Sequence, residues 1–293
     1  MAASTREIAF ITNPTAGKGK GSVIRDAAVQ RLREGGLVVR NLAGRTAQEA
    51  SDLAHQSIAD GVDGLVVCGG DGMFHLGMQA VAGTQVPIGF IPSGTGNDVA
   101  RYFDIPRNDP VAAADRIVAD RTRTIDLAKT GSLWYITVLA AGFDAIVNER
   151  ANAMSWPRGQ MRYNLATLAE LRTFTPLTYT LDLDGATRRL QAMLVAVGNG
   201  PSFGGGLRIT EGAVLDDGLL DVVIIKPMSK LGLIRTYPKL FSGTHVTHPQ
   251  YERHRVRRVT VAAPGIVAYA DGERLSPLPL TVECVPQALR VWA

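Results

Sequence analysis

The sequence predicts an α/β domain with a parallel sheet, followed by a second domain that is mostly an antiparallel β-sandwich. Within the first hundred or so residues, apolar strand-like runs end in glycine-rich or small polar loops that lead into helical patterns. Around residues 107–110 this pattern changes, and strand-like segments follow one another with few helices between them. We therefore expect two domains, which span residues 1–125 and 126–285.

The composition agrees with a globular protein of two domains. The chain has 293 residues, of which 46% are hydrophobic and 20% charged, which is enough apolar material for two cores. Its two cysteines cannot form a disulfide framework, and no run approaches the ~20 apolar residues of a membrane-spanning helix. We expect a cytoplasmic protein. The net charge of +4 decides nothing about nucleic acid and suits an anionic substrate or membrane surface.

The central element is the apolar run 65–68, which ends at Gly69-Gly70-Asp71-Gly72. A short β-branched run without polar alternation is typical of a strand buried on both faces of a parallel sheet. The glycines can be a simple turn or a backbone cradle for phosphate, and the residues alone leave both readings open. Asp71 would then lie at the carboxyl edge of the sheet, where open α/β sheets bind ligands.

Two further strand–loop–helix units surround this run. Strand 7–12 leads through the lysine-containing loop 13–22 into helix 23–34, and strand 87–92 leads through loop 93–98 into a helix capped by Asn97 or Asp98. The loop 13–22 matches neither the P-loop nor the dinucleotide-binding pattern. Right-handed crossovers should bring all three loops to one edge of the sheet. The remaining elements expected here are strand 37–42, helix 46–59 with Thr46 as its cap, and helix 73–81.

The second domain contains seven expected strands and two acidic motifs. The strands are 134–140, 177–184, 190–198, 219–226, 257–263, 267–270 and 280–285. The acidic motifs lie at 214–221 and at Asp271-Gly272-Glu273, and turn statistics alone favour exposed turns for both. An extended chain would point Asp271 and Glu273 to the same side, where they could serve a hydroxyl and a metal-bound phosphate together. The basic run 251–258 is typical of a solvated face, with anionic headgroups as the alternative.

Three motifs together carry a family resemblance. Asn13-Pro14-Thr15-Ala16-Gly17, Gly69-Gly70-Asp71-Gly72 and residues 92–98 (Pro-Ser-Gly-Thr-Gly-Asn-Asp) resemble, in this order, the diacylglycerol kinase catalytic-domain family. This family includes bacterial lipid kinases related to sphingosine and ceramide kinases. The third motif is the most specific one, because the Gly-Gly-Asp-Gly turn also occurs in NAD kinases. The resemblance implies an NAD kinase/phosphofructokinase-like first domain to which residues 286–293 return.

The resemblance also implies the residues of three sites. ATP would contact the glycine loops, the residues concerned being Asn13, Pro14, Thr15, Ala16, Gly17, Thr46, Gly69, Gly70, Asp71, Gly72 and Thr95. A structural Mg²⁺ would be held by Asp217 and by the carbonyls of Val214 and Leu219, since hard oxygen ligands suit this ion. Asp271 would be the catalytic base, with Glu273 in a supporting role.

The implied activity is ATP-dependent phosphorylation of diacylglycerol to phosphatidic acid by an enzyme peripherally associated with the inner face of the membrane. The expected partner is a lipid substrate, with no nucleic acid, and homodimerisation stays open. The alternatives are a sphingoid-base or ceramide kinase, an NAD kinase, and an inactive nucleotide-binding regulator. Residues 73–76 (Met-Phe-His-Leu) depart from the Thr and Asn-Glu usual in bacterial members.

Diacylglycerol is preferred over sphingosine on the charge of the acceptor. An ammonium group requires a carboxylate in an apolar cleft. Beyond Gly142-Phe143 we expect an extended strand, in which Asp144 has other neighbours and no further acid occurs before Glu149.

Overall fold

The computed structural model describes residues 6–12, 20–154, 156 and 175–293, and it divides the chain into two compact units. Unit 1 comprises Met1–Leu127 and Val285–Ala293, and unit 2 comprises Ala128–Cys284. Strands β5 (Thr122–Thr130) and β16 (Leu280–Trp292) contribute residues to both units. The predicted fold class, an α/β domain followed by a mostly antiparallel β domain, is confirmed.

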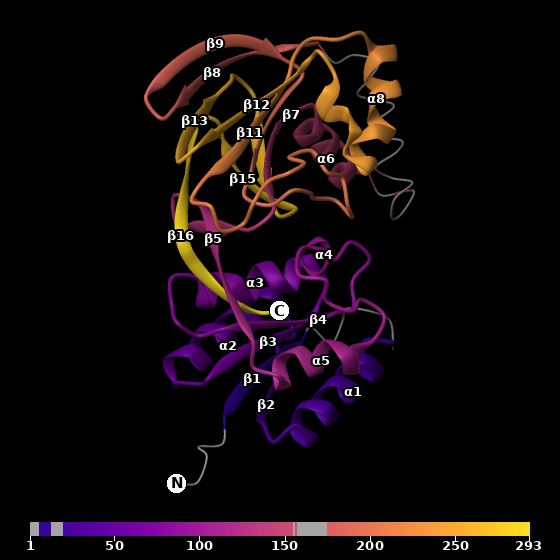
Figure 1. The fold of residues 1–293 in the computed structure, drawn as a ribbon, viewed down its shortest axis with the longest axis vertical. Coiled ribbons are helices and arrows are strands. Elements are labelled where there is room, and N and C mark those ends of the chain that lie inside the picture. The colour runs from indigo at the N-terminus through magenta and orange to yellow at the C-terminus, as the bar shows by residue number, and fades with distance from the viewer. Residues whose placement is uncertain (1–5, 13–19, 155, 157–174) are drawn as a thin grey trace. The chain divides into compact units, whose positions relative to one another are not determined.

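Unit 1 is built on a parallel sheet (Figure 1). Its strand order is β2-β1-β3-β4-β16, and every neighbouring pair is parallel. The strands are β1 (Glu7–Thr12), β2 (Val38–Ala43), β3 (Gly64–Gly69) and β4 (Ile88–Pro92). Because β1, β3 and β4 are adjacent and parallel, the loops that follow them leave the same edge of the sheet.

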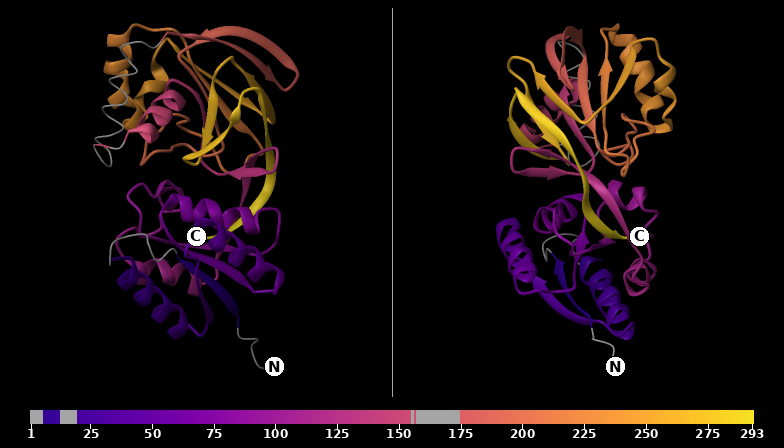
Figure 2. Two further views of the ribbon diagram at one scale, coloured as in Figure 1. Left: turned by 180° about the vertical axis from the view of Figure 1, so that it is seen from behind. Right: turned by 60° about the vertical axis from the view of Figure 1, so that its left-hand side comes forward.

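Helices cover both faces of this sheet (Figure 2). Helix α1 (Lys20–Glu34) packs with α5 (Pro110–Val118), and α2 (Ala47–Ala59) packs with α3 (Asp71–Val81). All residues of β3 are consequently buried, which is the physical reason for its unbroken apolar sequence. The short helix α4 (Asp98–Tyr102) follows the loop after β4.

Unit 2 contains two antiparallel sheet regions. One has the order β12-β11-β10-β7-β14-β15, and the other joins β16, β13, β8 and β9, with β5 and β6 alongside. The strands are β6 (Leu133–Tyr135), β7 (Val138–Gly142), β8 (Leu177–Leu183), β9 (Ala186–Ala192), β10 (Leu194–Gly198), β11 (Leu220–Ile225), β12 (Tyr251–Val256), β13 (Arg258–Ala262), β14 (Val267–Ala270) and β15 (Glu273–Pro277).

The six-stranded sheet is apolar on both faces. Alternate residues of β10 show this, since Val195 and Val197 belong to the sandwich core while Leu194 and Ala196 belong to a second buried cluster. Helices α6 (Phe143–Ala153) and α8 (Lys230–Ser242) contribute to that second cluster. A 3₁₀ turn, η1 (Thr244–Thr247), follows α8. In the described part of the chain, no helix is long and apolar enough to cross a membrane.

Two local predictions for unit 2 were wrong, namely the strand beyond Gly142 and the single strand 190–198. The expected strand beyond Gly142 is helix α6, in which the helix-forming Ala, Glu and Arg residues outweigh the short Ile146-Val147 pair. The basic run 251–258 forms strand β12 and the start of β13. The expected strand 190–198 is two strands, β9 and β10. Helix α8 was not predicted, although Ser229 caps its amino end and Gly243 follows its last residue.

Candidate functional site

The loops after β3 and β4 are in backbone contact. Ser93 N–H donates to the carbonyl of Gly69 over 2.7 Å. A Cβ atom on Gly94 would lie 2.6 Å from the Cα of Gly70, a distance that real Cβ atoms do not reach. The structure thus brings together two of the three predicted motifs, and Gly94 must be glycine for this approach.

The motif residues predicted after β1, Asn13 to Gly17, lie outside the described residues. Their role in nucleotide binding therefore stays a prediction. Thr46 is described, and its hydroxyl accepts the N–H of Glu49 over 3.1 Å as the N-cap of α2. Thr95 is exposed in the loop after β4, and Gly72 is exposed in the first turn of α3.

Asp71 links the two loops. It is the first residue of α3, and its Oδ1 accepts the N–H of Val99 in α4 over 3.4 Å. Burial raises the pKa of Asp71, and the neighbouring Asp98 raises it further, while backbone hydrogen bonds at the start of α4 act in the opposite direction. A carboxylate from the second motif therefore satisfies backbone donors of the third.

Asn97 does not cap α4 with its side chain, although it occupies the N-cap position. Its backbone is left-handed, with φ 53°, and its Nδ2 donates to the carbonyl of Gly94 over 2.8 Å. This bond holds the loop that approaches Gly70. The Asn97 side chain is buried, and its Oδ1 has no hydrogen-bond partner among the described residues. A buried acceptor of this kind indicates a place for a ligand donor.

The residues that depart from the usual family pattern belong to the core of unit 1. Met73 and Phe74 are buried on α3, and the Phe74 ring meets the Phe90 ring edge-on at a centroid distance of 5.2 Å. A Cβ atom on Gly69 would lie 2.4 Å from Cγ of Met73. Met73 thus packs directly over the end of β3.

Asp271 lies at the tip of a β-hairpin in unit 2. The turn Asp271-Gly272 joins β14 and β15 with φ values of 52° and 85°, so the turn that turn statistics favour is confirmed, and the extended chain that would point both acids to one side does not form here. Glu273 is the exposed first residue of β15. The turn reverses the chain between the two acids, so the argument from strand alternation does not apply to them.

The Asp271 carboxylate is held by the segment between β6 and β7. Its Oδ1 accepts the N–H of Thr137 over 2.9 Å and the hydroxyl of Thr137 over 2.6 Å, and its Oδ2 accepts the N–H of Ile136 over 3.2 Å. Thr137 is buried. Sequence reasoning missed Thr137, because no local pattern links two residues that are 134 positions apart.

A second cluster fixes the same hairpin from α6. Glu149 Oε1 accepts the hydroxyl of Tyr269 over 2.6 Å and Nε of Arg274 over 2.7 Å. These hydrogen bonds, from Tyr269 first and Arg274 second, lower the pKa of Glu149. Both hydrogen bonds come from residues within three positions of Asp271. Glu149 is therefore already paired with a cation.

Two aspartates of the acidic segment 214–221 form ion pairs with arginines of β12. Asp217 Oδ1 accepts the N–H of Leu219 over 3.1 Å, and its Oδ2 forms an ion pair with Arg255. Asp221 is buried and pairs with Arg253 over 2.5 Å. The basic strand β12 thus supplies counter-ions to these acids, which is why it is not simply a solvated face.

The predicted Mg²⁺ site requires a carboxylate at Asp217, and the turn supplies one. In this structure that carboxylate pairs with the guanidinium of Arg255. Among the described residues, no group of three or more His, Cys, Asp or Glu side chains is placed to hold a metal. The predicted Mg²⁺ ligands are one carboxylate and two backbone carbonyls, and this site stays a prediction. Arg255 would compete with the ion for Asp217.

Family models match nearly the whole described chain. The model for the diacylglycerol kinase catalytic domain matches residues 7–130, and the model for the YegS C-terminal NAD kinase beta sandwich-like domain matches residues 137–293. The chain is 42% identical over 291 residues to a diacylglycerol kinase of Mycobacterium tuberculosis, which covers 97% of this chain and 94% of that protein. A probable YegS-like lipid kinase of Pseudomonas fluorescens is 30% identical and covers 90% of this chain and 89% of its own length.

Solved structures agree with the fold. A crystal structure of a putative diacylglycerol kinase from Bacillus anthracis superposes with a TM-score of 0.81 at 21% identity, covering 99% of this chain and 98% of that one. The two family models follow one another along the chain in the order of the two units, and the relatives cover both. The chain therefore belongs to the diacylglycerol kinase catalytic-domain family.

Proposed function

We propose that this protein transfers the γ-phosphoryl group of ATP to the hydroxyl of diacylglycerol and so produces phosphatidic acid. The relatives named diacylglycerol kinase support this choice within a family of lipid kinases. The observation in this chain that carries the proposal is the environment of Asp271, a carboxylate held by three hydrogen bonds from Ile136 and Thr137. A fixed carboxylate is the group needed to accept the proton of an attacking hydroxyl.

In the proposed mechanism the glycine loops of unit 1 bind the nucleotide. The contact between Gly70 and Gly94 fixes the shape of these loops, Thr95 is exposed beside it, and Oδ1 of Asn97 offers an acceptor. Mg²⁺ bound with ATP would neutralise phosphate charge, whereas the Mg²⁺ that Asp217 would hold is a separate, structural ion. Asp271 accepts the hydroxyl proton as the new oxygen–phosphorus bond forms and ADP leaves. Positioning and charge neutralisation supply most of the rate enhancement in phosphoryl transfer.

The acceptor is proposed to be neutral because of Glu149. This acid follows Gly142-Phe143 in the sequence, and it is occupied by Arg274 and Tyr269. A carboxylate that already has a cationic partner is a poor partner for the ammonium group of a sphingoid base. A neutral diacylglycerol requires no such partner.

The decisive experiment is a competition between acceptors. Purified protein would be given radiolabelled ATP with diacylglycerol, sphingosine and ceramide in mixed micelles, and with NAD in a parallel reaction, before chromatographic separation of the products. Phosphatidic acid should be the main product, and Asp271→Asn should lower kcat by about 10²- to 10⁴-fold, the range of general-base catalysis. Mainly sphingosine phosphate, or no labelled product at all, would overturn the proposal.

A further inference from the structure

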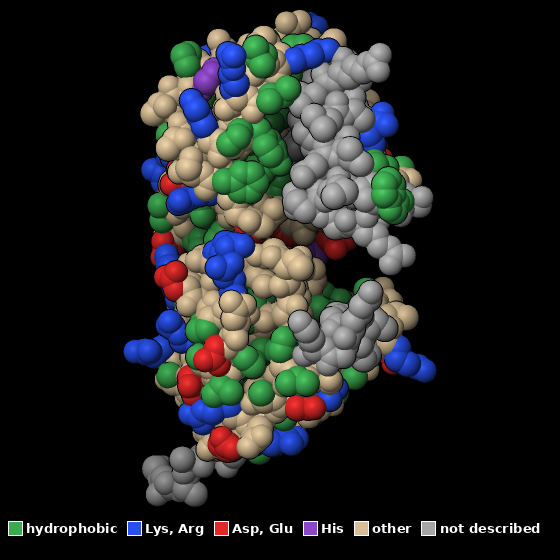
Figure 3. Space-filling view, turned by 90° about the vertical axis from the view of Figure 1, so that its right-hand side faces the viewer, with side chains coloured by type: hydrophobic (Ala, Val, Ile, Leu, Met, Phe, Trp, Pro, Cys, Tyr) green, Lys and Arg blue, Asp and Glu red, His purple; other side chains and the backbone are tan. Residues whose placement is uncertain are grey.

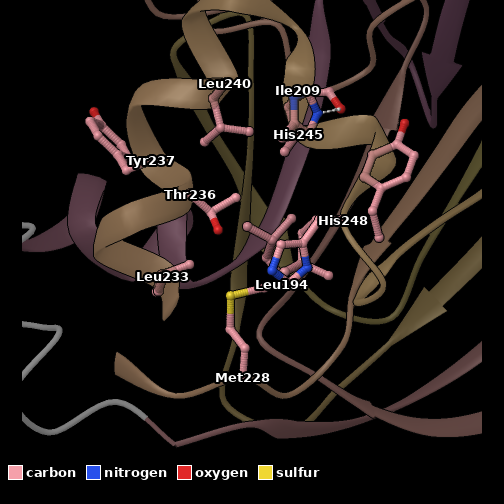
Figure 4. Close-up of a pocket in the computed structure, with 11 residues that line it drawn as sticks. Leu194, Ile209, Met228, Leu233, Thr236, Tyr237, Leu240, His245 and His248 are labelled. Atoms are coloured by element: carbon pink, nitrogen blue, oxygen red, sulfur yellow. Dashed lines mark hydrogen bonds between the residues drawn. The ribbon is translucent and has the colours of Figure 1, made fainter. Parts of the chain in front are cut away.

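Helix α8 is apolar on both of its sides. Its inner side packs on unit 2 through Leu233, Thr236, Tyr237 and Leu240, which line a small apolar pocket together with residues such as Leu194 and His245 (Figure 4). These four positions have the spacing of one helical face. Among the described residues, the inner side therefore attaches α8 to the sheet.

The outer side of α8 exposes large apolar side chains. Leu231 is 54% exposed, Ile234 48% and Phe241 46%, and Val246 in the following 3₁₀ turn is 37% exposed. The first three are separated by three and seven positions, so they lie on one side of the helix, where the Phe241 ring also meets the Tyr237 ring edge-on at a centroid distance of 5.8 Å. Nine large hydrophobic side chains are exposed on the described residues, and four of them fall within 231–246, so this is a patch rather than scattered exposure.

Basic side chains border this patch. Lys230, Arg235 and Lys239 are exposed on the same helix, and the spacing of four between Arg235 and Lys239 puts them along one edge of the apolar face. The sequence contains no Asp or Glu from 222 to 251, although acids make up 27 of 293 residues overall. Figure 3 shows hydrophobic side chains beside Lys and Arg side chains in the upper half of the molecule, which contains α8.

Two acids near this region, among the residues that the structure describes, are already paired. Glu211 lies next to Gly243 at the end of α8, and it forms an ion pair with Arg208 over 2.5 Å. Glu252 pairs with Lys226 over 2.7 Å. In the part of the chain that the structure describes, the patch therefore combines apolar side chains with the exposed cations Arg235 and Lys239.

We propose that the outer face of α8 docks the protein on the surface of an anionic lipid bilayer. Apolar side chains with flanking Lys and Arg are the features that let a helix lie in the interface of such a bilayer. This inference rests on the proposed function in one respect, since a lipid acceptor is presented at a membrane surface. A second copy of this chain fits less well, because a two-fold contact through this face would place like charges together.

The size of the patch also favours a bilayer. A stable protein interface buries about 800 Å² on each partner, whereas this patch consists of four partly exposed side chains. Reversible attachment to a bilayer requires only a few such side chains, together with about 1 kcal/mol for each Lys or Arg near the anionic surface. Each lost cation should then weaken binding about fivefold.

The test is sedimentation of the full chain with vesicles that contain neither diacylglycerol nor ATP. Wild-type protein should bind phosphatidylcholine vesicles with 30% phosphatidylglycerol, bind poorly to phosphatidylcholine alone, and lose affinity as salt rises. The double variant Arg235→Gln with Lys239→Gln should reduce vesicle affinity by about 25-fold, because the two fivefold effects multiply. Ile234→Gln with Phe241→Gln should reduce it at least tenfold at every salt concentration.

The matched controls are Val111→Gln and Arg33→Gln, which alter an exposed apolar and an exposed basic residue on helices of unit 1. They should bind vesicles as the wild type does, and circular dichroism should confirm that every variant is folded. The proposal is wrong if the α8 variants bind like the wild type or if the wild type binds no vesicle. It is also wrong if these variants alter only the oligomeric state in analytical ultracentrifugation, since the face would then cover a second copy.

The proposed activity is tested separately. If diacylglycerol is the acceptor, the α8 variants should lose activity on diacylglycerol in anionic vesicles and keep it on diacylglycerol in detergent micelles. If diacylglycerol is not phosphorylated at all, the vesicle-binding result still decides whether α8 docks on the bilayer.

Discussion

Replacing Thr137 by valine should separate the positioning of Asp271 from the folding of unit 2. The substitution keeps the shape of a buried side chain and removes one hydroxyl, which donates to Oδ1 of Asp271 over 2.6 Å. The two backbone donors, Ile136 N–H and Thr137 N–H, remain in place. The Asp271 turn should therefore still form, with its carboxylate less firmly oriented.

The magnitude follows from the type of hydrogen bond. A hydrogen bond to a charged group contributes about 1.5–3 kcal/mol, and about 1.4 kcal/mol corresponds to a factor of ten in rate. If the whole contribution acts on the orientation of the base, kcat should fall by about 10- to 150-fold. The KM for ATP should change little, because Asp271 is not among the residues proposed to bind the nucleotide.

The assay is steady-state phosphorylation of diacylglycerol in mixed micelles, with thermal denaturation alongside. Thr137→Ser restores a hydroxyl and should recover most of kcat. Thr210→Val is the matched control, because Thr210 is also buried in unit 2 and donates its hydroxyl to the carbonyl of Gly200 over 2.7 Å. It should lower the melting temperature and leave kcat near the wild-type value. A wild-type kcat in Thr137→Val, or an equal loss in both valine variants, would refute the reasoning.

Three further predictions concern the other sites. Asp71→Asn should stabilise the protein at pH 7, because burial raises the pKa of Asp71 and its ionisation therefore costs stability as the pH rises. The gain should vanish below about pH 4 in thermal denaturation. Gly94→Ala should weaken ATP binding in calorimetry, because its Cβ would push Gly70 away, and an unchanged affinity in a folded variant would contradict the cradle. Arg255→Gln should increase Mg²⁺ affinity if Asp217 is the ligand, and an unaltered Mg²⁺ titration would exclude that role.

The strands of the first unit could be predicted because their signals are local. The β-branched run before Gly69 predicts a buried central strand, and β3 occupies residues 64–69. Thr46 was predicted as a helix cap from its position alone, and it is the N-cap of α2. The order β2-β1-β3-β4 and the contact between Gly70 and Gly94 depend on how separate strands pair, which no single stretch of sequence specifies.

The parts that could not be predicted have long-range or mixed signals. The hydrogen-bond donors to Asp271 lie 134 and 135 positions away in the sequence, and the pairing of β14 with β7 brings them close to it. Helix α8 contains Pro238 and exposes Leu231, Ile234 and Phe241, so both a helix breaker and exposed apolar side chains obscure its local pattern. Asp271 itself was found through the family resemblance, while turn statistics favoured an ordinary exposed turn.

Trp292 packs in the core of unit 1 although it follows unit 2 in the sequence. Its side chain is 1% exposed, and its ring lies so close to Gly64 that a Cβ atom there would be 2.0 Å from it. Its Nε1 donates to Asp120 over 2.9 Å. The neighbouring Val291 pairs with Ile88 of β4. A nascent chain that has emerged only as far as residue 127 thus lacks the indole that packs against Gly64, so the glycine loops after β3 and β4 should become stable only after residues 128–293 have left the ribosome.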